Sequence, residues 1–530
     1  MKKIYLMLAL VAGVLSSCNM DKEPYGTLSD DDTFQTPNNF VSARAGLYTA
    51  LRACVGGETN YVAPELQCDH FNAVSGFSNT MSSMYRWEFT IDDGVFSGMY
   101  GNAQSTITRC NFIIDGYNKT DFSNTNIWDP NPSASSGEDR TDLGLLAAKK
   151  AKGDAFFTRA YALFMLAQYF CDAYDASTAD DANTGVSYTL TYDPSVSSAD
   201  YPGRNTLNQT YQQIYDDLDS ASVYVTATPQ ANNPYISVDA ITALRARVAL
   251  AKGDYELALD EASLLIESGT YTLCSSAADL TALYMYDGMN LGTGAATGAS
   301  EAIFELISAS TSELPSATGT VFLPYQEGSV PDYIPTRNFV DLFSNNDYRR
   351  SVYFEQTYIM TTAGAGGTVY VFNKYPDHGF LYQYTSGSES ARFNHMPNVF
   401  RIAEMYLIAA EASTMLGDLD EGRRYLEELQ ENRFENYSAP DLSTQDKLLA
   451  EIQDERTREL ACEGFRLPDL KRWHKGFSRG VPQQRDLCSL PGSSTTDMEV
   501  PADDPRLTWP IPKHEMNVNK QMVQNKGYAK

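Results

Sequence analysis

The sequence of 530 residues is poor in long hydrophobic runs and in basic side chains. No stretch reaches the roughly 20 consecutive apolar residues that a membrane-spanning helix needs, so we expect the body of the protein to lie in water. Lys and Arg together number 40 against 68 Asp and Glu, which gives a formal net charge of −28. A chain of this charge repels a phosphate backbone, which argues against a nucleic-acid partner.

The sequence also lacks the short motifs of common catalytic and cofactor sites. It contains no HExxH, no Walker loop and no EF-hand pattern. Its five histidines stand far apart in the chain, at His70, His378, His395, His474 and His514. The Asp180-Asp181 pair offers carboxylates for structural calcium, but no ligand spacing surrounds it. We therefore predict that the protein is not an enzyme and needs no cofactor.

Cysteine is present in eight copies, but without the spacing of a metal site. Seven are scattered through the body of the chain with no CxxC pair, at Cys54, Cys68, Cys110, Cys171, Cys274, Cys462 and Cys488. An odd number cannot pair completely. We expect most of them to be small buried hydrophobic side chains, and a structural disulfide is the alternative.

The eighth cysteine, Cys18, belongs to a different kind of signal. Lys2 and Lys3 precede an apolar run over Ile4–Leu15, and the sequence Leu-Ser-Ser-Cys follows at once. This order is typical of a lipoprotein signal peptide, and an ordinary secretory signal with an accidental cysteine is the alternative. We predict that residues 1–17 are removed and that Cys18 carries the acyl chains that anchor the protein to a membrane.

Amphipathic helices dominate the rest of the sequence. Residues 239–271 have the pattern of two helices joined at Gly253, and residues 404–433 repeat that pattern around Gly417. Small residues line the expected helix crossings, as in tetratricopeptide repeats. The pattern predicts a mainly α fold, built on a tetratricopeptide-like scaffold of about four helix pairs.

Two looser copies of the repeat lie at residues 153–170 and 206–224, and long segments of loop composition interrupt the scaffold. The insertions at about 172–204 and 275–395 are rich in Gly, Ser, Thr, Asp and Pro, with interspersed tyrosines. Alternating aromatic and β-branched residues at 369–384 predict a short hairpin, which is the minor β component of the fold. Long loops inside a compact domain are usually functional, so we expect the binding surface on this loop-rich face.

Three glutamates recur at four-residue intervals near the C-terminal end, at Glu455, Glu459 and Glu463. Paired carboxylates can serve glycoside hydrolysis. Four arginines crowd the same segment, at Arg456, Arg458, Arg466 and Arg472. We therefore predict that these carboxylates form internal ion pairs that hold their helix to its neighbours.

The same segment carries a family resemblance. Residues 451–476, EIQDERTRELACEGFRLPDLKRWHKG, are similar to the signature of the SusD-like (RagB/SusD) family. Blocks at 96–114, 336–354 and 509–528 resemble the family in the same order, so the resemblance covers essentially the whole chain. One departure is Cys171-Asp172, where the family often has Gly-Asp, and it bears on the loop that follows.

The resemblance implies that residues 18–530 form a single domain, with helical repeats at about 147–269 and 397–475. It implies a lipid-anchored nutrient receptor in the outer membrane, exposed at the cell surface of Bacteroidetes-type bacteria. Members of the family capture oligosaccharides, or sometimes peptides, for a SusC-like TonB-dependent barrel, and they are not enzymes. The alternatives are a repeat scaffold that binds no sugar, a peptide receptor, and an anchored glycoside hydrolase.

The resemblance also implies where a glycan binds. Starch-binding members use aromatic and polar side chains from the loop after the first helix and from insertions near the third repeat. The corresponding positions of this sequence are Asp69, Asn72, Tyr85, Arg86, Trp87, Tyr284, Tyr286, Tyr325 and Tyr333. We expect the rings to stack on sugar faces while the polar groups bind hydroxyls. If these residues bind the ligand, we expect Trp87→Ala to weaken binding with little loss of fold. The alternative is that the Trp87 ring packs the loop onto the helices.

Overall fold

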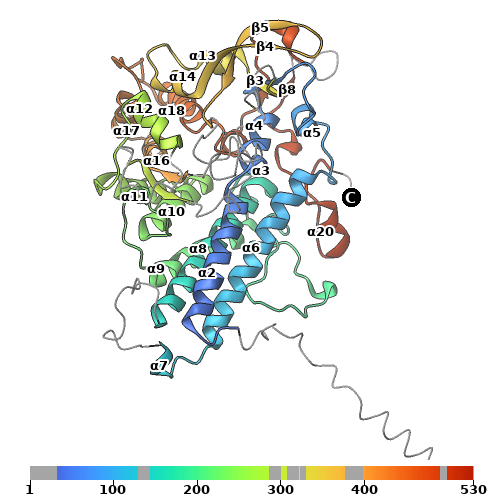
Figure 1. The fold of residues 1–530 in the computed structure, drawn as a ribbon, viewed down its shortest axis with the longest axis vertical. Helices are drawn as coiled ribbons and strands as arrows, with labels where there is room; N and C mark the ends of the chain where they lie inside the picture. The colour runs from blue at the N-terminus through green and yellow to red at the C-terminus, as the bar shows by residue number, and fades with distance from the viewer. Residues whose placement is uncertain are drawn as a thin grey trace, which may run out of the picture.

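The computed structural model describes residues 33–128, 144–285, 300–306, 322, 330–375, 398–489 and 498–528. The predicted signal peptide and Cys18 lie outside the described residues, as do Tyr286, Tyr325 and parts of the predicted insertion at 275–395. Helices form most of the described chain and the strands are short (Figure 1). The fold is therefore mainly α, as the sequence predicts.

Long helices run together at one end of the molecule (Figure 1), namely α2 (Pro37–Val55), α6 (Gly94–Lys119), α8 (Gly144–Phe170) and α9 (Leu207–Tyr224). Helix α8 packs against the other three and is buried over most of its length. A Cβ atom at Gly153 would lie 2.9 Å from the backbone nitrogen of Val225. Glycine at this position therefore permits the close approach of α8 to the end of α9.

The two clearest predicted repeats are helix pairs, α10 (Val238–Lys252) with α11 (Tyr255–Glu267) and α16 (Ile402–Met415) with α17 (Leu419–Glu431). Gly253 and Gly417 end the first helix of each pair with φ values of 75° and 91°. Asp254 and Asp418 then cap the second helix by accepting a backbone N–H three residues later. Helix α11 packs on α16, so the pairs form one scaffold.

The remaining helices have 4 to 15 residues. They are α3 (Glu58–Tyr61), α4 (Ala63–Gln67), α5 (Ser82–Arg86), α7 (Thr125–Trp128), α12 (Ala277–Met285), α13 (Arg337–Asp341), α14 (Tyr348–Tyr353), α18 (Gln445–Glu459), α19 (Arg466–Arg472) and α20 (Lys513–Val518). Within the described ranges, no helix combines the length and the apolar character that crossing a membrane requires.

The described strands form antiparallel pairs, β1 (Phe71–Ala73) with β3 (Tyr333–Pro335), β2 (Ala302–Glu305) with β6 (Asn398–Arg401), β4 (Phe354–Met360) with β5 (Gly366–Phe372), and β7 (Phe477–Ser478) with β8 (Glu499–Val500). Of the hairpin predicted at 369–384, residues 376–384 lie outside the described residues, and residues 369–372 form the end of β5. Strand β5 ends at Phe372 and pairs with β4, which precedes it. Gly364, with a φ of 84°, supplies the left-handed residue of the turn between them.

The insertion at 172–204 is a loop, as predicted, with one short 3-10 turn at Ser198–Asp200. It lies against α6, where the Asn111 side-chain amide donates to the backbone oxygen of Thr189 at 2.9 Å. Contacts of this kind fix the loop to the scaffold.

The seven cysteines of the described chain are free thiols, and all except the half-buried Cys488 are buried. The prediction that they are small core side chains is confirmed. Burial raises the pKa of the Cys54 thiol to about 11, which keeps it protonated at neutral pH.

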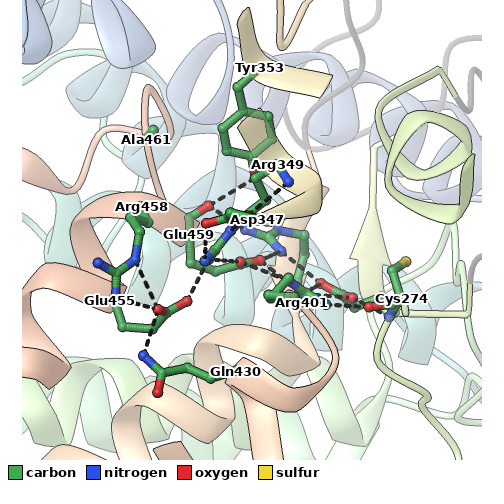
Figure 2. A network of polar contacts seen from close by, with 12 residues as sticks. Cys274, Asp347, Arg349, Tyr353, Arg401, Gln430, Glu455, Arg458, Glu459 and Ala461 are labelled. Carbon is green, nitrogen blue, oxygen red and sulfur yellow. Dashed lines mark hydrogen bonds and ion pairs between the residues drawn. The ribbon is translucent and has the colours of Figure 1, made fainter. Parts of the chain in front are cut away.

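Buried ion pairs join the C-terminal signature to the middle of the chain (Figure 2). Their centre is the carboxylate of Glu459, which lies 2.7–2.9 Å from guanidinium nitrogens of Arg349, Arg401 and Arg433. All four side chains are at most 1% exposed. Burial raises the pKa of Glu459, but the three guanidinium groups outweigh it and hold that pKa well below the ordinary value.

Several other charged groups of the signature are paired as well. The pairs are Glu455 with Arg349 and Arg458, Glu463 with Lys374 and Arg401, Arg466 with Asp69, and Asp469 with Arg456 and Arg472. The prediction of internal ion pairs is confirmed, although Glu463 lies beyond the end of α18.

We expect Glu459→Gln to lower the free energy of unfolding by about 3–5 kcal/mol, because it leaves three buried guanidinium groups without their shared counter-charge. Urea unfolding followed by circular dichroism measures the change. The control is Glu421→Gln, which breaks an exposed pair with Arg424 and should cost less than about 1 kcal/mol. Equal unfolding midpoints for the two variants would contradict a structural role for Glu459.

Candidate functional site

Strained backbone is concentrated in the segment between β1 and α6. Asn79, Met81 and Trp87 have φ values of 65°, 50° and 57°, and they are three of the eight non-glycine residues with positive φ in the described chain. This region of φ is unfavourable for most side chains, and each case costs on the order of 1–3 kcal/mol. Such strain clusters at ligand-binding sites, which makes this segment the candidate functional site.

Helix α5 places Arg86 over a group of aromatic rings. Its guanidinium carbon lies 5.7 Å from the ring centroid of Phe77, and Nη2 donates to the side-chain oxygen of Asn79 at 3.4 Å. The ring of Tyr333 lies 5.5 Å from that of Phe77 and 5.4 Å from that of Tyr85. Phe77 and Arg86 are half-buried, whereas Tyr85 and Tyr333 are fully buried. The two tyrosines therefore support the more exposed groups.

Asp332 ties this loop to the start of β3. Its carboxylate accepts the backbone N–H of Ser78 at 2.9 Å and the hydroxyl of Ser78 at 2.5 Å. The Tyr333 hydroxyl donates to the backbone oxygen of Thr80 at 2.6 Å. The partly exposed groups form one fixed aromatic and polar surface, the Phe77–Arg86 surface, which consists of Phe77, Asn79, Arg86 and Asp332.

Trp87 packs away from this surface, into the core. Its indole N–H donates to the backbone oxygen of Gln67 at 2.7 Å, its ring lies 5.9 Å from that of Phe477, and it is 6% exposed. Replacing a buried aromatic side chain with alanine costs about 3–5 kcal/mol. The burial of this ring therefore overturns the expectation that Trp87→Ala leaves the fold intact.

Asp69 and Asn72 contact the C-terminal segment. Asp69 pairs with Arg466 at 2.6 Å. Burial raises the pKa of Asp69, but Arg466 and the neighbouring His70 outweigh it and hold that pKa below its usual range. The buried Asn72 side-chain amide donates to the backbone oxygen of Gly480 at 3.3 Å. Both predicted residues therefore connect β1 to the framework.

Arg479 holds the candidate segment by hydrogen bonds to its backbone, and it is not among the residues predicted from the sequence. Its guanidinium lies 4.0 Å from the ring centroid of Tyr85 and donates to the backbone oxygens of Leu66, Cys68 and Tyr85. The side chain is buried. A single arginine among loop residues carries no pattern that predicts such contacts.

Tyr284 contacts a different group of rings. Its hydroxyl lies 2.9 Å from that of Tyr353, and the Lys374 ammonium lies 4.8 Å from its ring centroid. Among the predicted ligand residues, the structure brings Tyr85, Arg86 and Tyr333 together. Five of them are buried and make packing contacts: Asn72, Tyr85, Trp87, Tyr284 and Tyr333. Their part in ligand binding stays a prediction.

The pKa values of the signature carboxylates are lowered, as expected for carboxylates in structural ion pairs. Burial raises the pKa of Glu455, but Arg349 and Arg458 outweigh it and bring that pKa down to about 2. A catalytic acid of a glycosidase needs a raised pKa instead. Within the described ranges, no group of three or more His, Cys, Asp and Glu side chains is arranged to hold a metal ion.

Two family models match the sequence, one over the N-terminal half of the chain and one over its C-terminal third. The model described as "SusD family" matches residues 355–528, which include Glu459 and two of its partners, Arg401 and Arg433. The model described as "Starch-binding associating with outer membrane" matches residues 21–250, which include most of the Phe77–Arg86 surface. This chain belongs to the SusD-like family.

Relatives within the SusD-like family are distant in sequence. SusD-like protein P25 of Formosa agariphila is 28% identical over 204 residues, which cover 37% of this chain and 35% of that relative. SusD-like protein P38 of the same bacterium is 22% identical over 535 aligned residues, which cover 92% of this chain and 95% of the relative. The second match therefore spans nearly the full length of both proteins.

Solved structures agree with the SusD-like fold. A SusD superfamily protein from Bacteroides thetaiotaomicron superposes with a TM-score of 0.70 at 23% identity, covering 92% of this chain and 99% of that one. A SusD-like carbohydrate binding protein from Bacteroides vulgatus superposes with a TM-score of 0.69 at 17% identity, covering 94% and 98%. At these identities the likeness establishes the fold.

We expect Trp87→Ala to lower the free energy of unfolding by about 3–5 kcal/mol, because it empties a buried site. The adjacent Arg86→Ala is the matched control and should cost less than about 1 kcal/mol, since the Arg86 side chain is partly in solvent. Chemical unfolding of both variants measures the difference. Similar losses in the two would contradict the opposite orientations of these neighbours.

Proposed function

We propose that this protein is a lipid-anchored outer-membrane receptor that captures oligosaccharides at the cell surface and delivers them to a SusC-like TonB-dependent transporter. The Phe77–Arg86 surface carries the proposal. It combines a half-buried ring with a guanidinium, an amide and a carboxylate on a fixed backbone. A ring takes the apolar face of a sugar, and charged groups bind its hydroxyls.

The rigidity of this surface supports a role in binding. Asp332 and Tyr333 hold the loop from β3, and Arg479 holds it from the C-terminal segment. A loop that is already fixed loses little conformational entropy when a ligand binds, so more of the contact energy appears as affinity. The strained residues of the loop are thus compatible with a pre-organised site.

The comparisons support a carbohydrate ligand and an outer-membrane location. One matching family model is described as starch-binding and outer-membrane associated, and one similar structure is described as a carbohydrate binding protein. We assign the protein a binding role without catalysis, since the carboxylates of its signature are committed to ion pairs. Delivery to a transporter follows from the same proposal, because a tethered receptor needs a pore to pass its ligand inward.

We expect the mature protein to bind at least one member of a panel of oligosaccharides in isothermal titration calorimetry. Arg86→Ala should weaken that binding about 5- to 150-fold, which corresponds to about 1–3 kcal/mol. The control is Arg423→Ala on α17, a half-buried arginine of the repeat scaffold, and it should leave the affinity unchanged.

Three results would contradict this proposal. Binding of peptides but of no sugar would make the protein a peptide receptor, and binding of neither would make it a scaffold. Equal affinity in Arg86→Ala and Arg423→Ala would move the glycan site to another surface.

We expect Cys18→Ala to remove the protein from the outer-membrane fraction or to leave it unprocessed, because Cys18 is the predicted lipidation site. Cell fractionation and mass spectrometry of the N-terminus measure both outcomes. The control is Cys488→Ala, a half-buried cysteine of the body, which should stay membrane-bound. Cys18→Ala present in the outer membrane at the unmodified level would contradict the anchor.

A further inference from the structure

A small cavity lies where α8, α9, α10, α18 and α19 meet, away from the Phe77–Arg86 surface. Its volume is about 40 Å³. Since a cavity of about 10–15 Å³ already holds a water molecule, this one has room for a small ion or a few waters. Its charged lining consists of four cationic and two acidic side chains: Arg247, Arg456, Lys471, Arg472, Asp172 and Asp469.

Arg456 has an unused hydrogen-bond donor at this cavity. The side chain is 3% exposed, its Nε donates to Asp469 at 2.7 Å, and its guanidinium lies 5.1 Å from the ring centroid of Phe465. Its Nη1 atom is buried and has no acceptor among the described residues. A buried donor of a charged group left without an acceptor costs more than the usual 1–3 kcal/mol of a neutral one.

The two carboxylates that line the cavity already accept hydrogen bonds. The Asp469 oxygens are divided between Arg456 and Arg472. Asp172 is exposed, and its carboxylate accepts the hydroxyl of Thr508 at 2.6 Å.

The other cations of the lining differ in their partners: Arg247 pairs with Glu404 and Arg472 pairs with Glu411, whereas Lys471 bonds backbone oxygens. The Lys471 ammonium donates to the backbone oxygens of Gln168 and Cys171, at 2.8 and 2.7 Å, near the C-terminal end of α8. Burial lowers the pKa of Lys471 to about 8, so the amine is mostly protonated at pH 7 but loses its proton just above neutral pH. An anion in the cavity would favour the charged form of this lysine.

We propose that this cavity is a binding site for a small monovalent anion, either a halide or a carboxylate the size of formate, held by Arg456 Nη1 with Lys471 nearby. The unused donor of Arg456 favours an anion over a metal ion, and a hydrogen bond from a guanidinium to an anion is stronger than one from a guanidinium to a neutral water. The anion connects the end of α8 to α19, and thus the first repeat helices to the C-terminal signature.

The direct test uses crystals of the mature protein soaked in sodium bromide. We expect an anomalous bromide peak within hydrogen-bond distance of Arg456 Nη1, and formate should displace it if carboxylates bind as well. An ordered water at this position, with no anomalous signal, would overturn the proposal.

Stability in solution gives the second test. At constant ionic strength kept with the larger anion methanesulfonate, each tenfold rise in chloride should raise the melting temperature by about 1 °C once the site begins to saturate. Arg456→Lys, which keeps the charge but loses the Nη1 donor, should abolish this dependence. Arg159→Lys is the matched control, because Arg159 is buried and bonds Asp217 and Asn111 away from the cavity.

The control should lose stability but keep the chloride dependence. Chloride dependence that persists in Arg456→Lys, or that is absent from the unmodified protein, would overturn the proposal. Bromide bound without any effect of chloride on stability would indicate an adventitious ion only, which also overturns it.

Discussion

The carboxylate of Glu459 is the constraint on which the rest of the structure depends. It is buried and contacts the guanidinium groups of Arg349 and Arg401 (Figure 2), and that of Arg433. Removing one partner of a buried charge pair leaves an uncompensated charge, which proteins tolerate poorly. The end of α18 must therefore assemble together with α14, the end of β6 and the residue segment after α17, and this assembly joins the helical repeats to the loop-rich end.

The framework that Glu459 organises also carries the candidate binding loop. Two arginines downstream of α18 reach back to the N-terminal third of the chain: Arg466 pairs with Asp69, and Arg479 binds the backbone oxygen of Tyr85. Left-handed residues such as Met81 persist only where the surroundings over-determine the backbone. The ion pairs and carbonyl contacts supply that constraint, so the loop presents Arg86 in a fixed position.

Much of the scaffold could be predicted because its signals are local. Periodic apolar residues, a glycine at the helix end and a capping aspartate identify the α10–α11 and α16–α17 pairs directly. That the signature glutamates form ion pairs could be predicted, because arginines alternate with them in the sequence. Their partners could not, since Arg349 and Arg401 lie far away in sequence.

The sequence by itself determined the family, the helical repeats, the burial of the cysteines and the structural use of Glu455 and Glu459. Only the tertiary structure decided which rings of the predicted site are buried. Trp87 and Arg86 are adjacent, yet the left-handed φ of Trp87 sends its ring into the core while Arg86 stays at the surface. The physical reason is that periodicity and capping act within a few residues, whereas burial and left-handed backbone at non-glycine positions are imposed by contacts between segments hundreds of residues apart.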